Sequence, residues 1–167
     1  TVVKVTIGTA TLTVVETDYT GTYDGTSHPL SGQIPVKGLG GQPLDSDDYT
    51  VVFVKGEQKP EDWTTGAVES FQNVADSGTY WYKVTAPNYG EDTDSLTVQV
   101  DPKDLTLTHN ITETEKVYDG TTDISKENDP LTAALKDGEV DFDKGKLSVA
   151  EVKAAYDSKD VKTAKSI

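Results

Sequence analysis

Few side chains in this sequence are suited to acid–base or nucleophilic chemistry. The chain has no cysteine, which excludes thiol nucleophiles, disulfides and thiolate metal sites. Its two histidines, His28 and His109, stand beside Pro29 and Asn110, and neither has a serine or cysteine motif around it. A catalytic nucleophile needs a base within hydrogen-bonding reach. We therefore expect both histidines to be surface residues, and the chain to be no enzyme, with no catalytic residue and no cofactor.

Carboxylates are abundant, and hard oxygen ligands are what calcium prefers. The chain has 29 acidic residues; two acidic segments, 45–48 and 91–94, fall in expected loops, and a third lies at 141–145. The third begins like an EF-hand loop, but Gly145 occupies its fifth position, where an oxygen ligand is expected, and Lys146 its sixth. We expect these carboxylates to be solvated and to form no metal site.

Aromatic side chains offer a different kind of binding chemistry. Trp63, Trp81, Tyr82 and Tyr89 have flat apolar faces with polar edges, which suit stacking on a sugar. If Tyr82 points inward, strand alternation directs Trp81 outward, and the loop that carries Trp63 can cover it. We expect such cover, and we take Trp63 and Trp81 as the candidate ligand face should a sugar bind.

The charge of the chain excludes further partners. Fifteen basic residues, all lysine, oppose the 29 acidic ones, so the net charge is −14. This field repels phosphate and anionic lipid, and the arginine fork that reads bases is absent. No apolar run reaches the length of a membrane-spanning helix. We expect no nucleic-acid partner and no membrane insertion, and the lack of any methionine, even at Thr1, indicates a fragment of a longer protein.

The elements that would position these residues are strands. Threonine and valine are frequent, and apolar residues alternate with polar ones in 3–7, 12–14 and 95–100. Segment 48–54 is apolar on both faces, which predicts a central strand. A turn at 87–90 precedes the last of these strands, as in a hairpin. The fold class is therefore mostly β.

Segment 76–85 contains a D-x-G-x-Y motif formed by Asp76, Gly78 and Tyr80. This is the form of the tyrosine corner of immunoglobulin-like (Ig-like) sandwiches, in which the tyrosine hydroxyl bonds to nearby backbone. Tyr82 stands where antibody domains have a cysteine. We predict an Ig-like β-sandwich without its disulfide, in which these three residues have structural roles.

The chain also contains an internal repeat. A leucine–threonine strand precedes a Y-D-G-T turn twice, at 10–26 and at 104–122, with nearly the same spacing. The two turns predict tandem modules with a boundary between Val100 and Lys103. We expect the turn residues to be structural, with each tyrosine packed beneath its turn: Tyr23, Asp24 and Gly25 in the first, and Tyr118, Asp119 and Gly120 in the second.

These paired turns, with the late G-T-Y strand, resemble repeat modules of large bacterial surface proteins and adhesins, the MBG and YDG families of Ig-like repeats. The second copy is also similar to the late Y-x-S-K-D-V-G-T-x-K segment of the YDG family at 154–167, although Lys162 replaces the usual glycine. The resemblance implies an MBG-like module at 1–101 and a YDG-like module at 102–167. In the family the module continues past the position of Ile167, so we expect the second module to be incomplete.

Two passages of the second module have helical features. Segment 148–156 has the S-x-x-E spacing of a capping box followed by helix formers, whereas the resemblance implies a strand there. We favour the strand, because pairing overrides propensity in short segments, and leave both assignments open. Segment 131–136 is predicted to form a short helical turn.

The resemblance implies a function without chemistry. We expect a spacer or stalk in a secreted or cell-wall-anchored bacterial surface protein or adhesin, with neighbouring repeats of the same chain as partners. Two alternatives remain: a carbohydrate-binding accessory module of a surface glycosidase, and a calcium-rigidified adhesin repeat. The sequence does not identify a host or glycan ligand.

Overall fold

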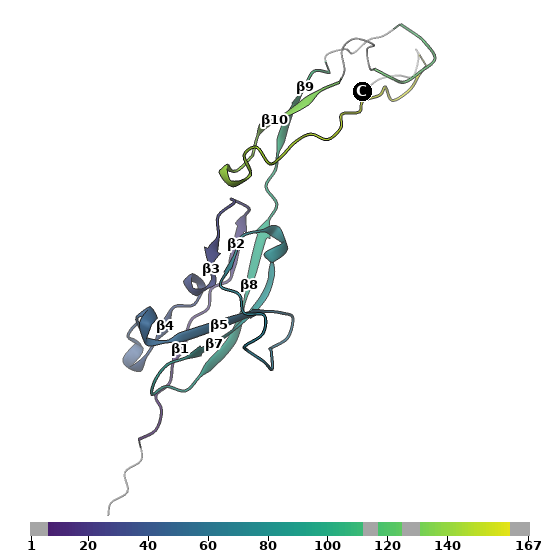
Figure 1. Ribbon diagram of the computed structural model, residues 1–167. Coiled ribbons are helices and arrows are strands. Elements are labelled where there is room, and N and C mark those ends of the chain that lie inside the picture. The colour runs from purple at the N-terminus through teal and green to yellow at the C-terminus, as the bar shows by residue number, and fades with distance from the viewer. Residues whose placement is uncertain (1–6, 112–116, 125–130, 161–167) are drawn as a thin grey trace, which may run out of the picture. The chain divides into compact units, whose positions relative to one another are not determined.

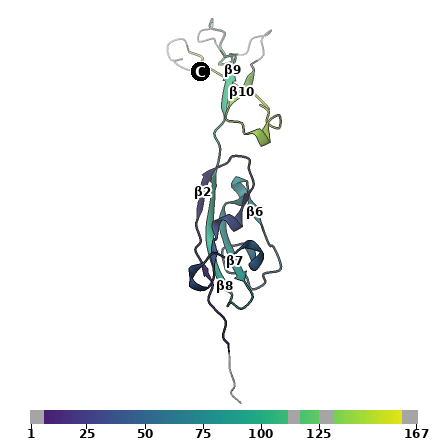
Figure 2. The same cartoon turned by 90° about the vertical axis from the view of Figure 1, so that its left-hand side faces the viewer.

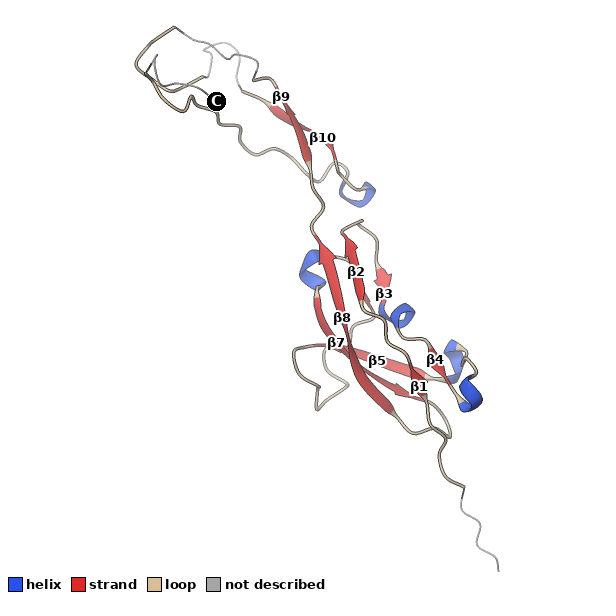
Figure 3. Ribbon diagram, turned by 180° about the vertical axis from the view of Figure 1, so that it is seen from behind, coloured by secondary structure: helices blue, strands red, loops and turns tan. Residues whose placement is uncertain are grey.

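The computed structural model describes residues 7–111, 117–124 and 131–160 (Figure 1). Their regular elements are strands and short 3-10 turns, which confirms the mostly β prediction (Figure 3). The chain divides into a first unit, Thr1–Lys103, and a second unit, Asp104–Ile167. Within the described ranges, no helix is long and apolar enough to cross a membrane.

The first unit is built around one mixed sheet of four strands in the order β2-β8-β7-β5. Strand β2 runs parallel to β8 (Figure 2), whereas β7 is antiparallel to both of its neighbours. Two smaller sheets pair β1 with β4 and β3 with β6. The strands are β1 (Thr13–Val14), β2 (Tyr19–Thr22), β3 (His28–Pro29), β4 (Val36–Lys37), β5 (Thr50–Lys55), β6 (Ser70–Phe71), β7 (Gly78–Thr85) and β8 (Asp92–Asp101).

Four 3-10 turns connect these strands: η1 (Leu30–Gln33), η2 (Leu39–Gly41), η3 (Ser46–Asp48) and η4 (Val74–Asp76). Strands β7 and β8 form the predicted hairpin, paired from Gly78↔Val98 to Val84↔Asp92. Its turn includes a hydrogen bond from Tyr89 N to Ala86 O (3.2 Å). The predicted strand at 3–7 lies outside the described residues except for Ile7, which is exposed and in no strand.

The core of the first unit lies between the four-stranded sheet and the shorter elements. Alternate side chains of the sheet are buried, as the period of two requires; they are Phe53, Tyr80, Tyr82, Val84, Leu96, Val98 and Val100. The shorter elements and the segments that flank them contribute the remaining buried side chains: Leu12, Leu30, Ile34, Val36 and Phe71. Tyr82 packs edge-on against Phe53 with ring centroids 6.4 Å apart.

The strand predicted to be central, β5, instead lies at the end of the four-stranded sheet. Beyond it, Val54 forms an isolated bridge with Ala67, and Val68 N donates to Phe53 O (2.9 Å). The half-buried Val52 and Val54 point away from the core, on the face that the loop 56–69 crosses. The apolar pattern of β5 thus reflects cover on both faces, which a loop can supply as well as a second sheet.

In the described part of the second unit, β9 (Thr106–His109) pairs antiparallel with β10 (Ala133–Asp137), and the 3-10 turn η5 (Asp141–Asp143) follows (Figure 1). The helical turn predicted at 131–136 is therefore wrong, because most of that segment belongs to β10. Thr132 N donates to Asn110 Oδ1 (2.8 Å), and Leu135 faces Leu107 in the ladder. These cross-strand partners override the local helix propensity.

Segment 148–156 is neither helix nor strand. It makes a single antiparallel bridge, Asp123↔Ala155, and Tyr156 N donates to Thr122 O (2.8 Å). Only this short contact agrees with the strand that we favoured. The late segment of the YDG resemblance is described as far as Asp160, and 161–167 lies outside the described residues.

Burial is sparse in the second unit. None of the residues described in it is buried, and several of its larger apolar side chains, among them Leu105, Leu107 and Phe142, are exposed. One close contact constrains its backbone: a Cβ at Gly138, where φ is 94°, would overlap the Asp104 carbonyl oxygen. Only glycine fits this position without moving the chain. Among the described residues, the units share the aspartate turn and an antiparallel pairing of the leucine–threonine segment, β1 with β4 and β9 with β10, whereas the four-stranded sheet is described in the first unit only.

Candidate functional site

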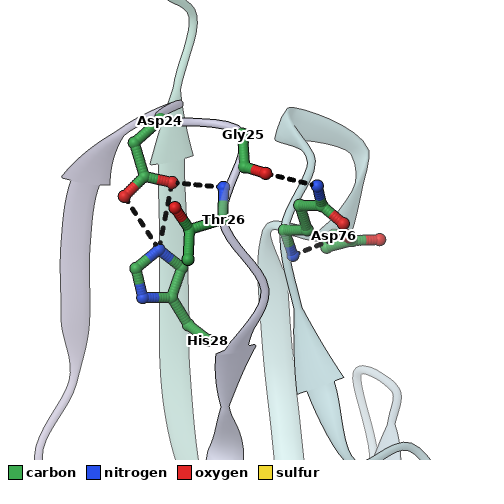
Figure 4. Close-up of polar contacts among 6 residues, drawn as sticks. Asp24, Gly25, Thr26, His28 and Asp76 are labelled. Carbon is green, nitrogen blue, oxygen red and sulfur yellow. Dashed lines mark hydrogen bonds and ion pairs between the residues drawn. The ribbon is translucent and has the colours of Figure 1, made fainter. Parts of the chain in front are cut away.

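The first site predicted from sequence is the turn at residues 23–26, which we call the Asp24 turn. Asp24 Oδ1 accepts a hydrogen bond from Thr26 N (2.7 Å), and Gly25 has a φ of 76° (Figure 4). The aspartate side chain thus closes an Asx turn and glycine supplies the left-handed backbone. The Thr26 amide lowers the pKa of Asp24, and the His28 ring lowers it further.

His28 is part of this site, although the sequence suggested a surface residue. Its Nε2 lies 3.2 Å from Asp24, and its side chain is only 28% exposed. The ring stacks on Phe71, with centroids 5.3 Å apart, and lies 5.2 Å from Tyr19. His28 faces Phe71 because β3 pairs with β6, a long-range contact that no local pattern indicates. The Asp-x-x-x-His spacing across a turn was the available signal. His109, by contrast, is exposed at the end of β9.

An aspartate–histidine pair can orient a general base, but here the neighbouring hydroxyl is directed elsewhere. Ser27 Oγ donates to Ser70 Oγ (2.9 Å), across the β3–β6 pair. His28 is held between a carboxylate and two aromatic rings rather than beside a nucleophile. The arrangement is that of a packed, oriented imidazole.

Gln72 connects the Asp24 turn to the second predicted motif. Gln72 Nε2 donates to Gly25 O (2.7 Å), while Gln72 N donates to Asp76 Oδ2 (2.9 Å) (Figure 4). The same oxygen accepts from Asn73 N (2.7 Å), so Asp76 completes a capping box on η4. The Asn73 amide is the main reason that the pKa of Asp76 is lowered. No sequence pattern indicated that Gln72 joins the two motifs.

The D-x-G-x-Y segment forms a tyrosine corner. Tyr80 Oη donates to Asp76 O (2.6 Å), and the ring is 1% exposed. Burial raises the pKa of Tyr80, and the charge of Asp76 adds to the effect. Gly78 has a φ of 147°, and a Cβ there would lie 3.0 Å from Lys55 Cε. Asp76, Gly78 and Tyr80 are therefore used in internal contacts.

The second unit repeats the turn but not its surroundings. Asp119 Oδ1 accepts hydrogen bonds from Thr121 N (2.9 Å) and Thr121 Oγ1 (3.0 Å), and Gly120 has a φ of 78°. Tyr23 packs against the core of the first unit, whereas Tyr118 is 60% exposed. The prediction that each tyrosine packs beneath its turn is wrong for Tyr118, since no closed core lies among the residues described there.

The two tryptophans lie on the outer face of the four-stranded sheet and are half-buried. Trp81 points away from the core, and its Nε1 donates to Gly56 O (3.2 Å). Trp63 lies in the loop that crosses this face, with Lys83 Nζ 5.6 Å from its ring centroid. Both indoles thus contact the chain itself, and each keeps part of its surface accessible.

A site that sequence reasoning missed lies at one end of the first unit. Tyr49 and Tyr89 line an open cavity of about 710 Å³, together with Asp47 and Asp48 from η3. Tyr89 falls in a predicted turn and Tyr49 in a predicted strand, and no sequence motif links the two residues. In the ranges that the structure describes, no three histidine or carboxylate side chains are grouped so as to hold a metal ion.

Comparison with known proteins identifies part of the chain. No curated protein and no solved structure matches it. Residues 101–167 match the YDG domain family, whose range begins just before the second unit at Asp104. The YDG part of the resemblance seen in the sequence is thereby confirmed, and the second unit is similar to a YDG domain.

Proposed function

We propose that this chain is a non-catalytic spacer region of a secreted or cell-wall-anchored bacterial surface protein or adhesin. The observation that supports the proposal most is that the residues of the sequence motifs form hydrogen bonds within the protein itself. Asp24, Gly25, Asp76 and Tyr80 all take part in hydrogen bonds within the first unit; those of Asp24, Asp76 and Tyr80 are local, and Gly25 bonds to the distant Gln72. A binding or catalytic site would leave its polar groups available to a ligand. The polar groups of these motif residues instead form hydrogen bonds that stabilise the strands and turns of the first unit.

Two further features support a spacer. The YDG match agrees with a repeat region, and we propose an Ig-like MBG-like module at 1–101 followed by a YDG-like module at 102–167. The net charge of −14 favours solubility and mutual repulsion between neighbouring repeats, which are the proposed partners. The physical role is to hold a functional domain away from the cell surface.

The alternative of a carbohydrate-binding module has one feature in its favour, the partly accessible faces of Trp63 and Trp81. Their contacts weigh against it, because the Trp81 N–H is already bonded to Gly56 and Trp63 lies against Lys83. Sugar stacking needs an open ring face with polar groups at its edge.

Tryptophan emission tests the choice, since the chain has only two tryptophans and both lie on this face. For a spacer we expect blue-shifted emission that does not change with a panel of oligosaccharides. A saturable change that Trp81→Ala abolishes, while a Trp63→Phe control keeps it and both variants stay folded, would replace the spacer with a binding module. In the same samples, a calcium-rigidified repeat would show a higher Tm with calcium; we expect no such rise.

A further inference from the structure

The open cavity at the end of the first unit has an apolar floor. It lies where β5 begins, where β7 ends and where the β7–β8 turn follows, so strands and a tight turn fix its walls. Four of its residues also pack against the core and form the floor: Leu44, Tyr49, Ala86 and Tyr89. We call this space the tyrosine cavity. Two tyrosine rings give it a flat, polarisable lining that suits a hydrocarbon chain or a cation.

The rim of the tyrosine cavity is acidic. Asp47 and Asp48 stand side by side on η3, and both are exposed, as are Thr50, Thr85 and Asn88. None of the described residues that line the cavity is a lysine, although the chain has 15. The cavity therefore combines an apolar floor with two uncompensated carboxylates in a chain of net charge −14. This combination matches a ligand with an aliphatic stem and a cationic head.

Backbone contacts hold both halves of the cavity in place. Tyr89 Oη accepts a hydrogen bond from Leu39 N (3.1 Å), and Tyr89 forms an isolated parallel bridge with Ala10. On the acidic side, Asp48 N donates to Asp45 O (2.9 Å), which fixes η3. A ligand would thus meet a largely preformed site and would not have to order it.

We propose that the tyrosine cavity receives a lysine or arginine side chain from a partner polypeptide. The aliphatic stem lies on Leu44, Tyr49 and Tyr89, and the charged group reaches Asp47 and Asp48. Small-molecule sites usually enclose most of their ligand. Because this cavity is open and its rim exposed, it fits one side chain of a larger partner better than a free small molecule.

The test is a titration of the isotope-labelled full chain with acetyl-Gly-Lys-Gly-amide, followed by NMR amide shifts. We expect saturable shifts at Tyr49, Thr85 and Tyr89, with a Kd on the order of millimolar. The matched peptide with norleucine in place of lysine keeps the stem and loses the charge. It should bind at least about fivefold more weakly, since the ion pairs with the rim are lost.

Matched variants distinguish binding by the carboxylates of the cavity from attraction of the peptide by the net negative charge of the chain. Asp47→Asn/Asp48→Asn should weaken lysine-peptide binding about fivefold or more, whereas Glu57→Gln/Glu61→Gln, which removes the same charge outside the cavity, should leave it nearly unchanged. Tyr49→Leu, checked for an unchanged fold, should weaken binding as well.

Three results would overturn the proposal: no shifts with millimolar lysine peptide, equal binding of the norleucine peptide, or equal weakening by the two double variants. Shifts at the cavity with a neutral oligosaccharide alone would assign it to a sugar instead. The tyrosine cavity is separate from the Asp24 turn and from both tryptophans, so the first three results leave the spacer proposal standing, whereas sugar binding would favour the carbohydrate-binding module instead.

Discussion

The two units contain the same turn and differ in what surrounds it. In both, an aspartate accepts the amide of the threonine two residues later, and the intervening glycine has nearly the same φ, 76° and 78°. Around the first turn, Tyr23 packs on a buried core, but beside the second turn Tyr118 is 60% exposed. Local sequence is therefore sufficient for the turn, because an Asx bond and a permissive glycine need no distant partner.

Burial, in contrast, depends on partners far along the chain. The buried side chains of the first unit extend from Leu12 to Val100, and their burial requires every strand between them. Among the residues described in the second unit, Leu105, Leu107 and Phe142 remain exposed beside a single strand pair. The stability of the first unit should thus be sensitive to core changes, and that of the second to changes in its backbone.

A pair of phenylalanine truncations should show the largest difference. Phe71 is 1% exposed and packs against Tyr19 and His28, whereas Phe142 is 53% exposed. Phe71→Ala should lower the free energy of unfolding of the first unit by about 3–5 kcal/mol, through lost burial and a cavity. Chemical denaturation followed by tryptophan emission measures it, because Trp63 and Trp81 both lie in that unit.

Phe142→Ala is the matched change in the second unit. It should cost less than about 1 kcal/mol, mainly through the lost contact with Lys146, whose Nζ lies 3.4 Å from the ring centroid. Calorimetry of the full chain measures this change. Comparable losses for the two variants would show that the second unit buries its apolar residues as the first does.

A backbone change should produce the largest effect in the second unit. Gly138→Ala places a Cβ against the Asp104 carbonyl at a φ of 94°, and should destabilise the β9–β10 pair by about 1–3 kcal/mol. Gly145→Ala is the control, since its φ of 75° is also left-handed but nothing lies within 4 Å of the new Cβ. Amide exchange at Leu107 and Leu135 reports the difference. Equal effects would mean that φ alone, and not the contact with Asp104, restricts Gly138.

Removing a tyrosine hydroxyl should have a smaller effect. Tyr80→Phe loses the 2.6 Å bond to Asp76 O and should cost about 1 kcal/mol in the free energy of unfolding of the first unit. Tyr118→Phe changes an exposed side chain and should stay within about 0.5 kcal/mol. Denaturation of both variants, followed by circular dichroism, makes the comparison. If Tyr80→Phe left the free energy of unfolding unchanged, the hydrogen bond of the tyrosine corner would not stabilise the first unit.

The smallest expected effect is the pH dependence from Asp76. The pKa of this carboxyl is lowered in the folded chain, chiefly by the Asn73 amide. Its contribution to stability is therefore present above the unfolded value of 3.8 and is lost as the pH falls through the folded value. The stability difference between the wild type and Asp76→Asn should shrink as the pH falls below about 5 and through the folded pKa. A difference that stays constant over that range would show that the Asp76 charge is not stabilising.

Local turn and alternation patterns predicted local structure well, whereas local helix propensity at 131–136 did not. The β7–β8 hairpin and the two aspartate turns needed only alternation and turn residues. The position of β5, the strand β10 and the parallel pairing of β2 with β8 depended on contacts between distant segments. Alternation shows which side of a strand is apolar, but it does not say which strand lies beside it.

The same division applies to the candidate sites. Asp24 and Tyr80 could be singled out because each belongs to a short motif with a known geometry. Gln72 and Tyr49 could not, since their roles come from partners in other strands and turns, and the spacing of Asp24 and His28 indicated only their pairing and not the contact of His28 with Phe71. A glutamine or a tyrosine alone carries no motif, so only the fold reveals the bridge and the cavity.

Hydrogen exchange of the full chain tests the contrast between the units most directly. Amides of β7, such as those of Tyr82 and Val84, should exchange only through global unfolding of the first unit, because both side chains are at most 1% exposed. Amides of β9 and β10 should exchange many times faster through local opening, with little dependence on denaturant. Equal protection in both units, with the same denaturant dependence, would contradict the account.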